Sequence, residues 1–471
     1  MKHTIRRTMV ALGAGVVMQR FCQLLGFLLV GNTLGVAGLG LFAQGQALAA
    51  VLTVLAGTGV RNLTARRLAA RPDAARELVF AAVRQRLALG AIAATVVIGC
   101  AFATSTAPWF WVFCALQVLP AAFDLKNLLD AAGRTRNEVA LETGVAALQL
   151  LAIVAWFCGG GDSATSVAVI ALACRCLYAA LAIPAVARLR GGEVGERAPA
   201  QPAMAVAQTA HELMTLGDVW LVALLFGDLA AGYYAFAVRL TAAALVPSSQ
   251  LARLLLPHLL HAGADGDASR TFSTALRATA LATLPMLAGG AVLAVALSAS
   301  VAGFAQAAPT LRWLLLAGCL QHLAWQCSHA LLALHRDRAF ANSLLWPAVL
   351  HLGCLVVFAQ SSNQGPPDAA SGAALAAVIA QCLYLAAGLI ATRSLWQRRP
   401  PSWVAPLVVA GATGLVTHLV GMLPSERNGP VLLLQLLAGA TTFGLGIWVT
   451  ELRGRWRRLG DGLAQASGLR A

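Results

Sequence analysis

The sequence FGDLAAGYYAFAVRL, residues 226–240, repeats a pattern that first occurs as LGVAGLGLFAQGQAL, residues 34–48. At an offset of 192 residues, Gly35 aligns with Gly227 and Gly40 aligns with Gly232. In each copy a bulky pair and an alanine follow the second glycine, and the whole phrase joins two apolar segments at a short turn. A repeat of this kind predicts two structurally equivalent halves.

The composition places the chain in a membrane. Of its 471 residues, 59% are hydrophobic and only 11% are charged, and the mean hydropathy is +0.74. A soluble protein has about 25% charged residues. The apolar segments lack the strict alternation of barrel strands, so the chain is expected to be an all-α integral membrane protein. Its ten cysteines lie in apolar segments without a CxxC pair and are interpreted as small core residues.

Apolar stretches long enough to cross a bilayer, about 20 residues each, recur from end to end. The sequence predicts fourteen spans: 8–32, 38–60, 87–105, 108–130, 138–158, 164–187, 206–227, 230–256, 273–298, 311–333, 339–359, 371–392, 403–421 and 430–450. The positive start and apolar run at the N-terminus imitate a signal peptide. Because the run continues far past any cleavage site, we interpret it as an uncleaved first helix.

The basic residues follow the positive-inside rule. With the N-terminus inside, 29 of the 34 Lys and Arg residues lie in inside segments and only Arg427 and Arg312 lie outside. This asymmetry predicts a multi-pass protein with both termini in the cytoplasm. The outside loops are short, the longest being about residues 360–371, so there is no room for an external catalytic domain. We therefore do not expect an enzyme.

The two copies of the repeat are six spans apart, and an even separation preserves their orientation in the membrane. The repeat is therefore parallel, with its axis along the membrane normal and a cavity between the halves. The expected organisation is a six-helix N-terminal half at 1–190 and a six-helix C-terminal half at 191–399. Residues 400–471 would add two spans and a basic cytoplasmic tail. Such halves can rock about a central site by alternating access.

The segment that starts LGDVW at residue 216 and ends at residue 259 resembles the central signature of the polysaccharide/O-antigen flippases (Wzx-type). These belong to the multidrug/oligosaccharidyl-lipid/polysaccharide exporter superfamily. The matching positions are Asp218, Gly227, Gly232, Tyr234, Ala235, Arg239, Leu240 and Pro257. The resemblance implies transport of an undecaprenyl-diphosphate-linked oligosaccharide from the inner to the outer leaflet of the bacterial inner membrane.

That transport would serve surface polysaccharide biosynthesis, for example of exopolysaccharide or of the O-antigen of lipopolysaccharide. The expected partners are the lipid-linked oligosaccharide, membrane lipids, a glycan polymerase and glycosyltransferases, and no nucleic acid. No cofactor is expected, and coupling to H⁺ or Na⁺ stays open.

Three arginines, Arg20, Arg175 and Arg239, lie within predicted spans. A charge there costs about 3 kcal/mol on insertion scales and usually faces a cavity or a partner. Guanidinium groups bind phosphate oxygens bidentately, so these residues, with Gln23 and Gln250 near them, predict a cationic cavity for a diphosphate head group. The alternative is that each arginine pairs with an acid on a neighbouring helix.

Four acids within or beside spans could provide ion coupling or ion pairs: Asp124, Glu142, Glu212 and Asp218. A carboxylate in a membrane cavity can bind H⁺ or Na⁺, and it can equally neutralise an arginine. Span 311–333 carries His322, Gln326 and His329 on one face, where they could line the cavity and bind sugar hydroxyls. Two histidines without further ligands predict no metal site.

Two other classes compete with a flippase. A cation-coupled multidrug or metabolite antiporter of the same superfamily usually has twelve spans and a less cationic cavity, so fourteen spans and three membrane arginines favour the flippase. A membrane glycosyltransferase, polymerase or ligase would need longer outside loops. No P-loop, nucleophile elbow or zinc motif occurs in a credible context.

Overall fold

The computed structural model describes residues 2–57, 75–105, 107–124, 135–187, 202–252, 259, 268–334, 336–361, 365–397, 401–422 and 428–447. Within these residues the regular structure is helical, without strands. The N-terminal half contains α1 (Lys2–Ala56), α3 (Ala75–Thr104), α4 (Pro108–Leu116), α5 (Val118–Ala121), α7 (Thr135–Cys158) and α8 (Ala164–Ala187). The C-terminal half contains α9 (Pro202–Leu216), α10 (Asp218–Ala244), α12 (Ala268–Ala299), α13 (Ala308–Ala333), α14 (Asp337–Ser361) and α15 (Pro366–Ala391). The chain continues through the short α16 (Arg393–Trp396) to α17 (Val404–Gly421) and α18 (Asn428–Ile447).

Each of the fourteen predicted spans contains helix, but three are interrupted within their described residues, at Gln117, Gly217 and Leu245. By length and hydropathy, nine helices in the described ranges qualify as membrane spans, with the two arms of α1 counted as one, and two shorter apolar helices accompany them. Large apolar side chains such as Ile92, Ile390 and Val404 are exposed on the outer faces, as lipid-facing positions require. The fold is therefore that of an all-α integral membrane protein.

The two aligned glycines of the repeat are the points at which α1 and α10 bend. Gly35 has φ 71° and ψ −174° inside α1, and Gly227 has φ 83° and ψ 173° inside α10. This backbone region is open only to glycine, because a Cβ would collide with the neighbouring peptide. Each helix therefore consists of two arms, and each arm belongs to a separate span. The equal distortion at equivalent positions confirms the predicted repeat.

The second pair of aligned glycines makes a reciprocal contact between α1 and α10. A Cβ on Gly40 would lie 1.9 Å from the backbone oxygen of Asp228, and a Cβ on Gly232 would lie 2.1 Å from that of Val36. Val36 and Asp228 are themselves one repeat apart. The contact thus maps onto itself when the halves are exchanged, which places the pseudo-two-fold axis between these turns. Only glycine permits backbones to approach this closely.

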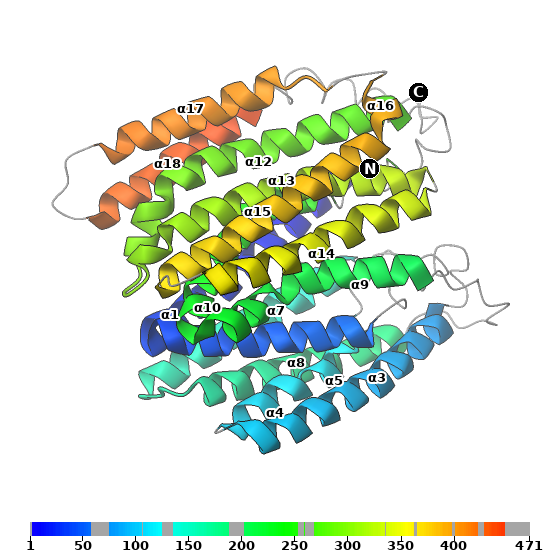
Figure 1. Ribbon diagram of the computed structural model, residues 1–471, viewed down its shortest axis with the longest axis vertical. Helices are drawn as coiled ribbons and strands as arrows, with labels where there is room; N and C mark the ends of the chain where they lie inside the picture. The colour runs from blue at the N-terminus through cyan, green and yellow to red at the C-terminus, as the bar shows by residue number, and fades with distance from the viewer. Residues whose placement is uncertain are drawn as a thin grey trace.

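The remaining helices pack around α1 and α10 in matching pairs. In the N-terminal half α7 packs on α1 and α3 packs on α4, while in the C-terminal half α14 packs on α9 and α12 packs on α13. Figure 1 shows α3, α4, α5 and α8 below and α12, α13, α14 and α15 above, with α10 between them. The additional helices α17 and α18 cover the far edge of the C-terminal half, where they contact α12.

The buried core lies where the halves meet and consists mainly of small residues. Aromatic side chains fill its centre: Tyr234 is fully buried, and the rings of Phe236 and Phe304 stack with centroids 4.6 Å apart. Three predicted spans are not continuous helices: 108–130 is divided between α4 and α5, and 206–227 between α9 and α10. The span at 230–256 is not continuous, because α10 ends at Ala244 and Leu245 forms a turn before a short helical stretch.

Candidate functional site

Two of the three predicted arginines meet between the halves. Arg20 lies on the first arm of α1, where its Nη1 donates to Oε1 of Gln23 at 3.3 Å. Arg239 lies on the second arm of α10, and its guanidinium carbon is 5.2 Å from the ring centre of Phe27. Because Arg20, Gln23 and Phe27 are spaced by three and seven residues, they share one face of α1. Arg239 is held over that face by a cation–π contact.

Arg175 completes the cluster from α8, which also packs on α1. Arg239 lies within electrostatic range of both Arg20 and Arg175, and both interactions are repulsive because all three side chains are positive. Arg175 additionally interacts with the carboxylate of Asp124, which follows α5. We call Arg20, Arg175 and Arg239 the arginine cluster. Its members come from three different helices, so folding has gathered their charges from distant parts of the sequence.

Two side chains of the arginine cluster are exposed, which indicates open space beside them. Arg20 and Arg239 both have exposed side chains. Arg239 nevertheless follows a run of buried residues on α10 that includes Tyr234 and Phe236. Within the described part of the chain neither Arg20 nor Arg239 forms an ion pair. The alternative prediction was that each arginine pairs with an acid. Among the described residues, only Arg175 of the three interacts with one, Asp124.

The repeat relates the arginine cluster to a chemically different surface in the other half. Residue 20 corresponds to residue 212 and residue 47 to residue 239 at the offset of the repeat. Arg20 is therefore matched by Glu212, and Arg239 is matched by Ala47. The backbone is nearly symmetric while the charge is not.

A second polar cluster lies at the Gly227 bend. The hydroxyl of Tyr234 donates to Oδ2 of Asp218 at 2.7 Å, across the bend and between the two arms of α10. Nε2 of His351, on α14, lies 2.6 Å from the other carboxylate oxygen, Oδ1. Both partners of Asp218 are buried, His351 at 1% and Tyr234 at 0% exposure. The aspartate that the sequence singled out is thus enclosed by a hydroxyl and an imidazole.

The predicted polar face of α13 is mostly enclosed. His322 is buried, its Nδ1 lies 2.7 Å from the Gly318 backbone oxygen, and its ring packs against Trp325. Gln326 is fully buried with no partner for its amide among the described residues, whereas His329 is half-buried. The structure therefore places His322 and Gln326 within helix packing.

The other predicted residues are scattered. Gln250 is half-buried beyond the end of α10, so the helical face that was expected to join it to Arg239 is interrupted at Leu245. Glu142 on α7 and Glu212 on α9 are half-buried and engaged in interactions. Asp124 is exposed, and its backbone oxygen accepts a bond from Arg86. Pro257 of the predicted signature lies outside the described residues, as do the domain boundary at 190–191 and the C-terminal tail.

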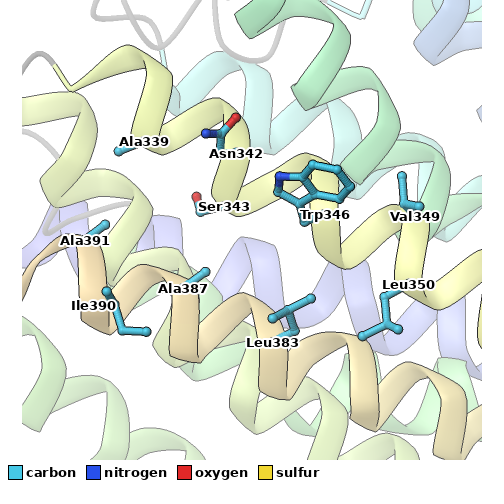
Figure 2. A pocket seen from close by; sticks show the side chains of 10 residues that line it. All are labelled: Ala339, Asn342, Ser343, Trp346, Val349, Leu350, Leu383, Ala387, Ile390 and Ala391. Carbon is cyan, nitrogen blue, oxygen red and sulfur yellow. The ribbon is translucent and has the colours of Figure 1, made fainter.

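A groove of about 650 Å³ lies elsewhere, between α14 and α15. Figure 2 shows Trp346, Leu350, Leu383 and Ile390 along it, with Asn342 and Ser343 as its polar members. Trp346 and Ile390 are exposed on the lipid-facing side of the helices. An apolar groove without a charged lining residue suits hydrocarbon and cannot bind a charged head group. The candidate site is therefore the arginine cluster.

The described helices thus form two halves in a parallel repeat, with charged side chains between them. The chain has the fold of transporters from the multidrug/oligosaccharidyl-lipid/polysaccharide exporter (MOP) superfamily. One similar structure is the lipid II flippase MurJ in an inward closed conformation. It has a TM-score of 0.68 and 13% identity, and the match covers 93% of this chain and 98% of that one.

Further structures share the fold. An inward-facing multidrug resistance MATE family transporter of the MOP superfamily has a TM-score of 0.60 and 14% identity, over 82% of this chain and 99% of that one. A MOP superfamily transporter from Pyrococcus furiosus has a TM-score of 0.58 and 14% identity, over 83% of this chain and 96% of that one. No protein-family model and no curated protein sequence matches the chain.

Two residues of these clusters, His351 and Phe27, were not predicted from the sequence. His351 was detectable as an ionisable residue in the middle of an apolar span, a position that usually has a function. Its partner, however, is 133 residues away in sequence. Phe27 resembles any other core aromatic, and only the packing of α10 on α1 shows that it lies beneath a guanidinium group.

Proposed function

We propose that this protein transports an undecaprenyl-diphosphate-linked oligosaccharide from the inner to the outer leaflet of a bacterial inner membrane by alternating access. The observation that supports this most strongly is the arginine cluster between the two halves. Three like charges repel one another, and Arg20 and Arg239 have no acidic partner among the described residues. A bound diphosphate supplies the missing negative charge.

The chemistry of the cluster suits this head group. Guanidinium groups form bidentate bonds with phosphate oxygens, and a hydrogen bond between charged groups contributes about 1.5–3 kcal/mol. The Phe27 ring under Arg239 restrains the guanidinium without neutralising it. The unequal charge of the two halves, with Glu212 opposite Arg20 in the repeat, suits a cargo that is anionic at the diphosphate and neutral along the sugar chain.

The lipid chain of such a cargo would stay in the bilayer while the head group crosses. The cargo would come from glycosyltransferases on the cytoplasmic side, and a glycan polymerase would receive it outside. Together these steps would build a surface polysaccharide. Both termini would lie in the cytoplasm, as the distribution of basic residues requires.

A cation-coupled multidrug or metabolite antiporter is the second candidate, because transporters of that class share the fold. The two functions differ in the charge of the cargo. The arginine cluster repels organic cations and attracts anions, so an antiporter with this site would be restricted to anionic or neutral compounds. A bilayer-anchored diphosphate satisfies the cluster more fully than a neutral drug.

The proposal is tested by deleting the gene in the source bacterium and restoring it with variants. We expect Arg20→Ala and Arg239→Ala each to reduce surface glycan and to accumulate lipid-linked oligosaccharide in the cells. Arg270→Ala is the matched control, because Arg270 is an exposed arginine on α12, outside the cluster. Insertion is checked by membrane abundance.

Binding is measured separately on the purified protein by quenching of tryptophan fluorescence. Undecaprenyl diphosphate should bind more tightly than undecaprenyl monophosphate, and each arginine removed should weaken binding about 10- to 100-fold, the equivalent of 1.5–3 kcal/mol. Normal surface glycan in a variant with Arg20, Arg175 and Arg239 all replaced by alanine would refute the proposal. Drug efflux in place of glycan export would favour the antiporter.

A further inference from the structure

Asp218, Tyr234 and His351 form a closed polar cluster that transport of a diphosphate does not by itself require. Asp218 lies on the first arm of α10, Tyr234 on the second arm and His351 on α14. The two bonds to the carboxylate, of 2.6 and 2.7 Å, use one oxygen each. The cluster therefore ties both arms of a bent helix to a third helix through one carboxylate.

The arrangement around His351 leaves a place for one proton. Its Nε2 bonds to Asp218, and its buried Nδ1 has no hydrogen-bond partner among the described residues, with the backbone of Ala376 on α15 close to the ring. When the imidazole is neutral and the carboxylate is ionised, the Nε2 proton points at the carboxylate, Nδ1 carries a lone pair, and the pair has a net charge of −1. When one proton is added at Nδ1, both ring nitrogens carry protons. The pair is then ionic and internally neutral.

Other titratable and charged side chains on the neighbouring elements do not supply the positive charge that the proton would place beside Asp218. The charged groups, histidines and tyrosines on the elements packed around the cluster include His211 and Glu212 on α9, Asp228, Tyr233 and Arg239 on α10, Arg20 on α1, Arg312, His322 and His329 on α13, Asp337 and Arg338 on α14, and Asp368 and Tyr384 on α15. The charged group that acts on both His351 and Tyr234 is Asp218. The positive charges of Arg20 and Arg175 act on Arg239 instead.

A sodium ion fits this cluster poorly. Hard cations are bound by several oxygen ligands, and imidazole nitrogen is a poor ligand for them. Here both oxygens of Asp218 already accept hydrogen bonds, and the third group is a histidine. No group of three or more His, Cys, Asp or Glu residues within the described ranges could hold a metal ion.

We propose that Asp218, His351 and Tyr234 form a proton-binding site that loads and releases one proton in each transport cycle. This inference rests on the proposed function and answers which ion couples it. A loaded proton joins α14 to the first arm of α10 by an ion pair, and its release removes the charge that holds them together. Because Tyr234 ties the same carboxylate to the second arm, the proton acts on the bent helix whose second arm carries Arg239.

The site is tested without cargo by nuclear magnetic resonance of the full chain, labelled with ¹⁵N in its histidine rings, in detergent micelles from pH 5 to 9. One ring should titrate between the neutral and imidazolium forms, and its signals should be lost in His351→Gln and changed in Asp218→Asn. The control is His418→Gln, an exposed histidine on α17. An unchanged set of titrations in both cluster variants would overturn the proposal.

Coupling is tested by adding undecaprenyl diphosphate to the purified protein in weakly buffered solution with a pH-sensitive dye. The wild type and His418→Gln should exchange about one proton per bound lipid, and His351→Gln should exchange none. Lipid binding without proton exchange in the wild type would overturn the proton site and leave the proposed function intact. A histidine titration in a protein that does not bind the lipid would overturn the proposed function instead. Saturable ²²Na⁺ binding that Asp218→Asn abolishes would show that the site holds sodium.

Discussion

Replacing Gly232 with alanine should separate the two halves at their axis. The new methyl group would lie 2.1 Å from the backbone oxygen of Val36, and ordinary contact begins at about 3.4 Å, so α1 and α10 must move apart by about 1.3 Å. The obstacle is backbone, which cannot rotate away as a side chain can. Overpacking of this kind costs about 1–3 kcal/mol.

The equivalent change in the first copy of the repeat provides an internal check. Gly40→Ala would place its methyl group 1.9 Å from the Asp228 oxygen and should destabilise the protein at least as much. Because one separation of the helices relieves both clashes, the double variant should cost less than the sum of the single variants. The control is Gly144→Ala on α7, whose methyl group would meet nothing within 4 Å and should be neutral or slightly stabilising.

The assay is thermal unfolding of the purified protein in detergent, followed by fluorescence-detected gel filtration. The melting temperature of Gly232→Ala and Gly40→Ala should fall clearly below that of the wild type, while that of Gly144→Ala should not fall. The reasoning is refuted if the axial variants are as stable as Gly144→Ala. Strict additivity in the double variant would mean that the two contacts do not share one interface.

Other substitutions test individual contacts of the fold and site. Gly227→Ala should cost about 1–3 kcal/mol through backbone strain alone, because its methyl group would meet nothing within 4 Å; equal stability to wild type in the same unfolding assay would contradict this. Phe27→Leu should remove the ring beneath Arg239 and weaken undecaprenyl diphosphate binding by about 0.5–2 kcal/mol in fluorescence titrations, whereas Phe27→Tyr should retain binding. Tyr384→Phe should break the buried bond with Ser328 and lower the stability by about 1 kcal/mol, and an unchanged melting temperature would show that the bond contributes nothing.

The membrane fold could be predicted because its signals are local. A span needs about 20 apolar residues in sequence, and basic residues in adjacent loops mark the inside. The bends at Gly35 and Gly227 could also be predicted, because the repeat places these two glycines at matching turns between apolar segments. The break at Leu245 was missed although its signal is also local: Pro247 follows two residues later, and a proline is common just after the end of a helix.

The sequence could identify the residues of the site one by one, but it could not predict how they are arranged in space. A charge in an apolar span is conspicuous, so Arg20, Arg175 and Arg239 could be identified singly. Their convergence depends on the packing of α1, α8 and α10. The burial of His322 and Gln326 likewise depends on which face of α13 its neighbours cover, and an apolar helix carries little pattern that would reveal this.

The sequence by itself determined that the chain crosses a membrane many times, that it repeats with a parallel offset of 192 residues and that three arginines lie in its spans. These properties depend on composition and on spacing along the chain. The tertiary structure alone decided that Gly40 and Gly232 face the opposite backbones at the axis, and that His351 meets Asp218. Such contacts depend on the rotation of each helix about its own axis. In a lipid environment, where every face can be apolar, that rotation is set by close packing between helices and not by the hydrophobic pattern.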